Sequence, residues 1–455
     1  MDNRKVTNDL LDFLEASPTA FHAVNNIRNQ LKAVGYTELR ESEIWELVPG
    51  GRYFTVRNES ALIAFRIPEE PIHGFMIAAS HSDSPAFKVK ANPEMNSADA
   101  YTTLNVEKYG GMLIYPWFDR PLSVAGRVLL KREDGTLETR LVNIDRDLCM
   151  IPSLAIHMDR DANKGHELNV QKELIPIFGD QDARGRFMEL VAEAAMTTRE
   201  NIVGDDLFLY VRGRGSVWGA SQEYVSAGHL DDLQCSFADL KGFLRSDPVV
   251  MKATTMEDLV RRDSASGTAP VLAIFDNEEV GSGSKQGADS TYISDVLNRI
   301  RYCMAIKDEA FRCVIANSFM LSVDNAHAVH PNYADKSDPV NRPKMNGGIV
   351  MKYNANQKYT TDGVSSAVFK LLCEREGLKY QEFTNRSDMA GGSTLGNIAN
   401  AHVSLNTVDI GLPQLAMHSP YETAGVKDTA DLIQLTERFF QSEFEDLGMG
   451  RFALN

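Results

Sequence analysis

Cysteine is scarce in this sequence, and the few cysteines present do not form pairs. The 455 residues contain five of them, without a CxxC motif. An odd, scattered set excludes both a disulfide framework and a zinc–thiolate cluster, and indicates reduced thiols in a cytoplasmic protein. The five are Cys149, Cys235, Cys303, Cys313 and Cys373.

Basic residues and long apolar runs are also in short supply. The chain has 47 lysines and arginines against 63 acidic residues, a formal net charge of −16. Because nucleic-acid partners require a basic footprint, this balance argues against them, and it argues equally against an anionic membrane surface. No apolar run approaches the roughly 20 residues that span a bilayer. The opening segment, MDNRKVTNDLLDFLEAS, lacks the apolar core of a secretory signal.

The length and the order of the patterns predict two domains. A chain of 455 residues exceeds the roughly 250–300 at which single cores stop growing. Amphipathic segments predict helices at 4–16 and 19–34, and regular alternation of strand-like and helical runs resumes at about 229. The stretch between is rich in strand patterns. We therefore predict an α/β domain built from residues 1–92 and 230–455, with a β-rich insertion at 93–229.

Individual segments within these domains carry more specific expectations. In the insertion, YGGMLIYPWF (109–118) is strand-like. In the second half, LDDLQCSFADLKGFLR (230–245) predicts a helix and VLAIFDN (271–277) a buried strand. The stretch LIQLTERFFQSEFEDL (432–447) predicts a closing helix.

Two adjacent glutamates, Glu278 and Glu279, follow the apolar run VLAI. A surface pair of this kind is usually solvated charge, so the pair alone is a weak signal. Other acidic and histidine residues also follow apolar runs, however, and ligands collect at the carboxyl ends of strands in open α/β sheets. The additional residues that we expect at this edge are His81, Asp83, Asp231, Asp324 and His418.

This combination of side chains suits a pair of divalent metal ions. Zinc binds imidazole nitrogen and carboxylate oxygen, and two metals roughly 3.5–4 Å apart need one carboxylate to bridge them. Two histidines and three carboxylates meet that requirement and leave one glutamate as a general base. Asp231 and Asp232 could instead be helix N-terminal carboxylates favoured by the dipole. We keep that interpretation for Asp232 and assign Asp231 to metal.

The segments HSDSPAFKVK, LDD, DNEEVGS, SVDNAHAVHPNY and QLAMHS occur in this order. In these motifs the sequence resembles the M18 family of metallo-aminopeptidases, the aspartyl aminopeptidases, along nearly the whole chain. The resemblance implies a three-layer, mixed-sheet dinuclear-zinc peptidase domain with an inserted β-rich domain for dimerisation and substrate gating. It also implies dimers that assemble into a dodecamer.

The resemblance also implies roles for individual residues. It assigns one zinc to His81, Asp231 and Asp324, and a second zinc, bridged through Asp231, to Glu279 and His418. Cobalt or manganese would suit the same ligands. The catalytic positions that it implies are Glu278 as the general base and Asp83 as the acid that orients the site. The substrate-contacting positions that it implies are His157, His327, Lys352 and Tyr359.

In the family, the counterpart of His157 reaches into the neighbouring subunit's active site. The Gly228-His229 pair before LDD departs from the family pattern and brings an unexpected imidazole close to the metal bridge.

The activity implied is removal of an N-terminal Asp or Glu from peptides. A related dinuclear deacylase or carboxypeptidase is the nearest alternative, since Lys352 could receive a C-terminal carboxylate. A non-catalytic assembly protein is a third, but the intact set of ligands together with Glu278 argues against it.

Overall fold

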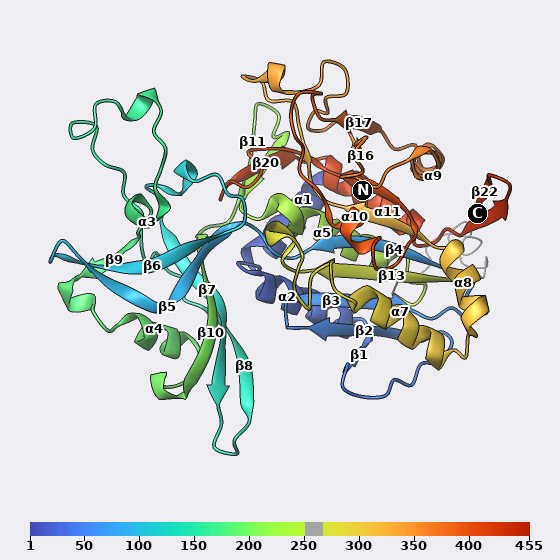
Figure 1. Ribbon diagram of the computed structural model, residues 1–455, viewed down its shortest axis with the longest axis horizontal. Coiled ribbons are helices and arrows are strands. Elements are labelled where there is room, and N and C mark those ends of the chain that lie inside the picture. Colours follow the sequence, from blue (N-terminus) through green and yellow to red (C-terminus); the bar gives the residue numbers. More distant parts are fainter. Residues whose placement is uncertain (251–266) are drawn as a thin grey trace.

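The structure, a computed structural model, describes residues 1–250 and 267–455. A nine-stranded mixed sheet lies at the centre of the larger part of the molecule (Figure 1). Its middle strands β13, β4, β14 and β18 run parallel, whereas antiparallel pairs flank them. In spatial order the strands are β1 (Thr37–Leu39), β2 (Arg52–Arg57), β3 (Ala61–Arg66), β13 (Thr268–Phe275), β4 (Gly74–His81), β14 (Phe319–Val323), β18 (Asn406–Gly411), β16 (Ile349–Tyr353) and β17 (Tyr380–Thr384).

Both faces of this sheet are covered, so strands at its centre are buried along their whole length. Every residue of β4 and β13 is buried, as expected for parallel strands between two helical layers. Successive side chains of β13 alternate between two cores: Leu272 and Ile274 pack on one face, and Val271 and Ala273 on the other. The result is the three-layer, mixed-sheet α/β architecture that was predicted.

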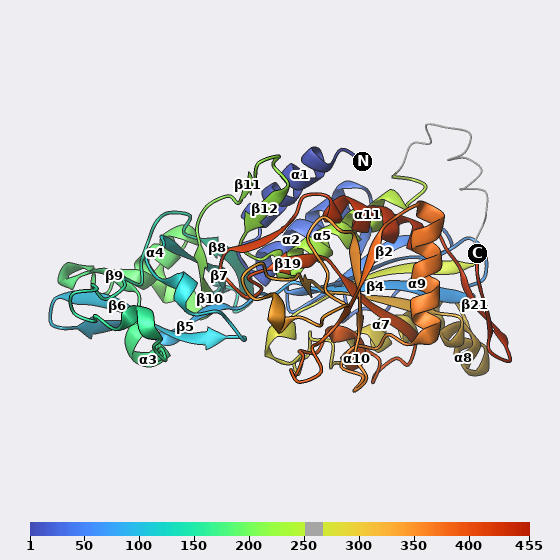
Figure 2. The ribbon, with the colours of Figure 1, turned by 90° about the horizontal axis from the view of Figure 1, so that it is seen from above.

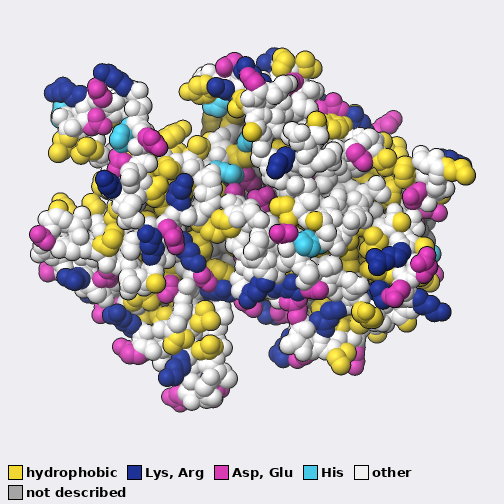
Figure 3. All heavy atoms as spheres, in the orientation of Figure 1, with side chains coloured by type: hydrophobic (Ala, Val, Ile, Leu, Met, Phe, Trp, Pro, Cys, Tyr) yellow, Lys and Arg dark blue, Asp and Glu magenta, His cyan; other side chains and the backbone are white. Residues whose placement is uncertain are grey.

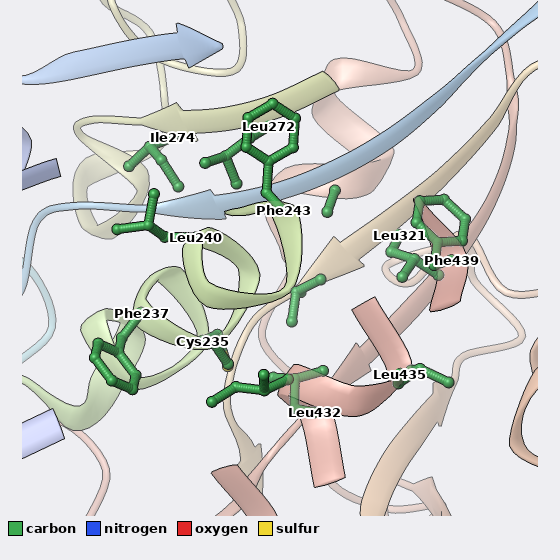
Figure 4. Packing of buried hydrophobic residues seen from close by; sticks show 14 of the residues in the cluster. Cys235, Phe237, Leu240, Phe243, Leu272, Ile274, Leu321, Leu432, Leu435 and Phe439 are labelled. Atoms are coloured by element: carbon green, nitrogen blue, oxygen red, sulfur yellow. The ribbon is translucent and has the colours of Figure 1, made fainter. Parts of the chain in front are cut away.

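The helices divide between these two cores. Figure 4 shows side chains of α5 and α11 packed against Leu272, Ile274 and Leu321 of the sheet. The helices on this face are α1 (Asn3–Glu15), α2 (Ala20–Ala33), α5 (Leu230–Arg245), α9 (Gly363–Glu376) and α11 (Asp428–Phe439). Those on the opposite face are α7 (Tyr292–Cys303), α8 (Asp308–Ala316) and α10 (Leu395–Ala399). In the described ranges, no helix combines the length and the apolar character that crossing a membrane requires.

A second sheet projects to one side of this body (Figures 1 and 2). It is antiparallel and has a hydrophobic core of its own, which includes Trp117 and Phe187. Two short helices, α3 (Val170–Glu173) and α4 (Phe187–Ala194), belong to the same stretch of chain. Its strands, in spatial order, are β8 (Leu137–Asn143), β7 (Leu122–Lys131), β10 (Ile202–Val211), β5 (Ala86–Ser97), β6 (Tyr101–Tyr109) and β9 (Ile177–Asp180).

The division into 1–92 with 230–455 and an insertion at 93–229 stays a prediction, and residues 251–266 of that range lie outside the described chain. The second sheet already begins with β5 at Ala86. Before residue 229, the chain also contributes to a third, small sheet. That sheet orders β11 (Ser216–Trp218), β12 (Tyr224–Ala227), β20 (Glu422–Gly425), β19 (Pro413–Leu415) and β15 (Ala326–His327).

Two segment predictions are wrong. Residues 109–118 do not form a strand, because β6 ends at Tyr109 and a 3₁₀ turn follows at Tyr115–Trp117. Pro116 lies in that turn and has no N–H to donate to a strand ladder. The closing helix α11 ends at Phe439, and the rest of the predicted helix joins a hairpin of β21 (Phe444–Gly448) and β22 (Arg451–Leu454).

A separate core predicts separate stability for the second sheet. Phe187 is fully buried there and packs edge-on against Phe178, with the two ring centroids 5.8 Å apart. We expect Phe187→Ala to cost about 3–5 kcal/mol, since truncating a buried aromatic leaves a cavity. Hydrogen-exchange mass spectrometry should show the loss of protection in residues 86–211, while β4 and β13 keep theirs. Phe237→Ala, in the core between α5 and the central sheet, should lower protection in the central sheet and leave residues 86–211 protected. Equal loss of protection everywhere in both variants would contradict separate cores.

Candidate active site

Three neighbouring strands of the central sheet end at the site. β13, β4 and β14 run parallel and side by side, so their carboxyl ends meet at one edge. His81 is the last residue of β4, Asp324 directly follows β14, and Glu278 and Glu279 form a 3₁₀ turn after β13. Figure 3 shows histidine and acidic side chains together in a hollow of this face.

The small sheet supplies the other two residues. β12 ends at Ala227 and leads into Asp231, which has extended backbone angles (φ −83°, ψ 109°) although it lies within the first turn of α5. His418 lies in the turn between β19 and β20, with a positive φ of 66°. The pairing of β12 with β20 therefore brings segments nearly two hundred residues apart to the same edge.

The atoms that could bind metal form two groups that share Asp231. In the first, donor atoms of His81, Asp231 and Asp324 all lie within 4.8 Å of one another, and in the second the same holds for Asp231, Glu279 and His418. Asp231 faces each group with a different oxygen. Its Oδ1 is 3.4 Å from His81 Nε2, and its Oδ2 is 3.6 Å from His418 Nε2. The arrangement suits two cations bridged by one carboxylate.

Both imidazoles present Nε2 to Asp231 because their Nδ1 atoms are engaged elsewhere. His81 Nδ1 lies 3.1 Å from the Asp83 carbonyl oxygen, and His418 Nδ1 lies 2.7 Å from the Gly111 carbonyl oxygen. A ring nitrogen next to a carbonyl oxygen carries the proton, which leaves the lone pair on Nε2. This is the ring orientation that metal-ligating histidines adopt.

The electrostatics of the site call for positive charge. Asp231 Oδ1 and Glu279 Oε1 are buried and receive no hydrogen bond, which is costly for carboxylate oxygens. Burial raises the pKa of Glu279 well above its usual range, and the charge of Asp231 raises it further. Burial likewise raises the pKa of Asp324, although Lys352 opposes the shift. These residues fit a metal centre, since divalent cations would satisfy the bare oxygens and offset the repulsion.

Asp83 holds the glutamate pair in place. Its carboxylate accepts hydrogen bonds from the backbone N–H of Glu278 (3.1 Å) and Glu279 (3.2 Å), and from the Tyr109 hydroxyl (2.6 Å). Oδ1 of the same carboxylate also lies 3.3 Å from His81 Nδ1. Burial, together with the charges of Asp324 and Asp83, raises the pKa of Glu278 to about 8.

A cavity of about 190 Å³ opens onto both metal-ligand groups. Lys352 is 3% exposed, and its Nζ lies 3.7 Å from Asp324 Oδ1. Burial lowers the pKa of Lys352, but Asp324 and Tyr359 outweigh that effect, so its pKa lies above the usual range. Burial, with the charge of Lys352, lowers the pKa of His327. The predicted residues that line this cavity are His81, Asp231, Glu278, Glu279, Asp324, His327, Lys352, Tyr359 and His418.

Two histidines that sequence reasoning singled out lie elsewhere. His157 is exposed on the long loop of the second sheet and does not line the cavity. His229 borders a neighbouring cavity of about 230 Å³, where burial lowers its pKa to about 4. It is therefore a neutral residue beside the centre rather than one of its grouped ligands.

Three further features of the site had no clear signal in the sequence. Asp232 is buried, and its Oδ2 accepts the His81 N–H at 3.2 Å, so it does more than favour a helix dipole. Phe383, from the edge strand β17, packs on His327 and Tyr359 at the cavity wall. Glu422 is buried next to Asp231 and His418. Its place four residues after His418 could have suggested a connection, although a lone glutamate is a weak signal.

Comparison with known proteins agrees with this geometry. The sequence model of the aminopeptidase I zinc metalloprotease (M18) family matches residues 13–440. A relative named probable M18 family aminopeptidase 2, from Clostridium novyi (strain NT), is 46% identical over 431 residues, which cover 93% of this chain and 96% of the relative.

Two solved structures are similar along most of the chain. The cryo-EM structure of the Ape4 and Nbr1 complex contains a chain that is 34% identical, with a TM-score of 0.90, covering 96% of this chain and 86% of that one. A structure of the S. cerevisiae mApe1 dodecamer is 26% identical, with a TM-score of 0.83 and 97% coverage of both chains.

A metal centre formed by these residues would make the stability of the protein depend on bound cations. Removing divalent ions with a chelator should lower the thermal unfolding temperature, because the buried carboxylates then repel one another. The loss should reach about 4 kcal/mol where the free ion had been at 1,000 times its Kd. Differential scanning calorimetry before and after adding zinc back measures it. Asp231→Asn removes the shared carboxylate, so a chelator effect as large as in the wild type would contradict the prediction.

Proposed function

The chain belongs to the aminopeptidase I zinc metalloprotease (M18) family, and on that premise we propose that it removes the N-terminal residue of peptides with a preference for Asp and Glu. The observation that carries the proposal is the buried Lys352 ammonium in the same cavity as both metal-ligand groups. A positive charge in that cavity would pair with the carboxylate of an acidic first side chain.

Two divalent cations, zinc in the first instance, would be held by the two groups that share Asp231. Cobalt and manganese suit the same nitrogen and oxygen ligands. When bound, such cations polarise the scissile carbonyl group and make a water molecule more acidic. The bare oxygens of Asp231 and Glu279 support this assignment.

Glu278 would act as the general base. It would take a proton from the attacking water and return it to the leaving amine, and a carboxylate whose pKa burial raises to about 8 can both accept and release a proton near neutral pH. Asp83 would fix its position through the backbone N–H of Glu278. A neutral His327 at the cavity wall could donate a hydrogen bond to the oxygen of the tetrahedral intermediate. Glu279 would lie next to the free amino group of the substrate, which restricts cleavage to the first residue.

Local charge would decide specificity. The net charge of −16 opposes an acidic peptide, but at physiological salt that field decays over about 8 Å. A desolvated ion pair between Lys352 and a substrate carboxylate is screened much less. Tyr359 lies beside Lys352, with its ring centroid 5.6 Å from Nζ, and would help hold the carboxylate.

We also propose a cytoplasmic homo-oligomer, a dodecamer built from dimers. One similar solved structure is titled as a dodecamer. His157 lies on a loop with exposed Leu154, Ile156 and Met158, at 60, 47 and 76% exposure. Burial of these apolar side chains against a second subunit would bring His157 to that subunit's cavity.

Lys352 also supports a second candidate, a dinuclear deacylase or carboxypeptidase that binds a C-terminal carboxylate. Turnover of Asp-p-nitroanilide compared with N-acyl amino acids separates the two activities. A non-catalytic assembly role would require neither turnover nor Glu278.

Replacing the proposed base tests the mechanism. Glu278→Gln should lower kcat by about 10²–10⁴, because proton transfer is lost while the side-chain shape is kept. Metal content, measured by atomic emission on the same sample, should match the wild type. Glu279→Gln should lose metal instead. If Glu278→Gln loses metal, the roles of the two glutamates are exchanged.

Replacing the buried lysine tests specificity. Lys352→Ala should lower kcat/KM for Asp-p-nitroanilide by about 10–100-fold relative to Leu-p-nitroanilide, as expected for the loss of a hydrogen bond between charged groups. Lys370→Ala, a partly exposed lysine paired with Glu382, serves as the control and should leave the ratio unchanged. An unaltered preference for Asp over Leu in Lys352→Ala would refute the specificity proposal.

A further inference from the structure

One buried carboxylate connects two of the proposed metal ligands through their backbones. Glu422 is 2% exposed. Its Oε1 accepts the backbone N–H of His418 at 2.7 Å, and its Oε2 accepts the backbone N–H of Asp231 at 3.0 Å. Both oxygens are thus used, each by a different ligand segment.

Glu422 itself is held by strand pairing. It is the first residue of β20, where it lies opposite Ala227 of β12, four residues before Asp231. Gln414 on the adjacent strand β19 brings its Nε2 to 3.5 Å from both Glu422 Oε1 and Asp231 Oδ2. Asn325 in turn donates to Gln414 Oε1 at 3.0 Å. The Glu422 carboxylate is therefore held by paired strands and by the Gln414 side chain, and not by an unpaired loop.

The segment that carries His418 needs such support. His418 has a φ of 66° and Ala416 a φ of 56°, a region that residues with a Cβ adopt at an energetic cost. Two other contacts hold His418 from the side of the second sheet: Leu113 N donates to its carbonyl oxygen at 3.0 Å, and its Nδ1 faces Gly111 O. Glu422 joins the backbone of His418 to that of Asp231.

We propose that Glu422 is a positioning residue for the cation group of Asp231, Glu279 and His418, and that it sets the metal affinity of that group. The inference rests on the ligand assignment made under the proposed function. Glu422 fixes two of the three members of this group but only Asp231 of the group with His81 and Asp324. Its loss should therefore weaken the two cation sites unequally.

Both carboxylate oxygens are required for this role. A glutamine at position 422 offers one acceptor oxygen, and its amide N–H₂ would face a backbone N–H, donor against donor. One of the two ligand segments would then lose its hydrogen bond while the volume of the side chain stays the same. Asp83 plays the corresponding part for Glu278 and Glu279, so the two carboxylates act on different segments.

Zinc titration of the metal-free protein against a competing chelator tests the proposal. Glu422→Gln should raise the apparent Kd of one of the two sites by about 10–100-fold, the usual effect of removing a partner of a metal ligand. The other site should change by less than about 3-fold on the same scale. The weakened site should be the one that His418→Ala abolishes. Glu422→Asp keeps both oxygens and should recover part of the affinity.

Asp428→Asn is the matched control. Asp428 is another buried carboxylate that accepts two backbone N–H groups, from Asn346 at 2.7 Å and Gly348 at 3.0 Å, but neither donor is a proposed ligand. It should lose stability in a thermal melt without loss of zinc affinity. The same loss of affinity in Asp428→Asn, or unchanged zinc affinity in Glu422→Gln, would overturn the proposal.

Zinc titration of the variants distinguishes a wrong positioning role from a wrong ligand assignment. If His418→Ala and Asp231→Asn bind as much zinc as the wild type, the ligand assignment is wrong and the positioning role is wrong with it. If those variants lose zinc but Glu422→Gln does not, only the positioning role is wrong. Neither result depends on which peptides the enzyme cleaves.

Discussion

The buried carboxylate of Asp231, with one oxygen towards each of two imidazoles, is the contact on which the rest of the site depends. It makes one centre out of two halves: strand ends of the central sheet deliver His81 and Asp324, and the small sheet delivers His418. A shared carboxylate of this kind concentrates negative charge where water cannot screen it. Positive ions at this point would therefore stabilise the fold, and the unpaired oxygens of Asp231 and Glu279 are the atoms that they would contact.

Two further carboxylates stabilise the backbone around this charge. Asp83 receives the N–H groups of Glu278 and Glu279, and Glu422 receives those of Asp231 and His418. Carboxylates are expensive to bury, so their use as acceptors for backbone N–H groups indicates that precise placement of the ligand segments outweighs the cost. Tyr109 connects the first of them to β6 of the second sheet, and Gly111 holds the His418 ring from the same region. The second sheet thus contributes to the order of the centre as well as lying beside it.

What the sequence could predict follows from how local each signal is. His81, Asp324 and the glutamate pair lie at or shortly after the ends of apolar runs, so their meeting at one sheet edge was predictable from strand patterns alone. Asp231 and His418 were also expected at this edge, but their meeting depends on β12 pairing with β20, a contact between short strands about two hundred residues apart. No local pattern specifies that contact, and the assignment of His418 leaned on the family resemblance. Glu422 and the Asp232 contact with the His81 N–H have no periodic signal, because their importance arises only from that pairing. The strand prediction for residues 109–118 was wrong for the opposite reason. The local pattern is strand-like, but Pro116 and the packing of Trp117 override it.

The balance of charges in the cavity links metal binding to the choice of substrate. Among the described residues, four carboxylates line it, from Asp231, Glu278, Glu279 and Asp324, against the one ammonium of Lys352. Without cations the cavity would repel an acidic side chain, and Lys352 would remain associated with Asp324 at 3.7 Å. Two divalent cations would carry four positive charges, enough to offset the carboxylates and free the ammonium for a substrate carboxylate. The proposed preference for acidic peptides is therefore compatible with an acidic chain, because bound ions a few ångströms away, and not the net charge of the protein, would decide the sign of the field at Lys352.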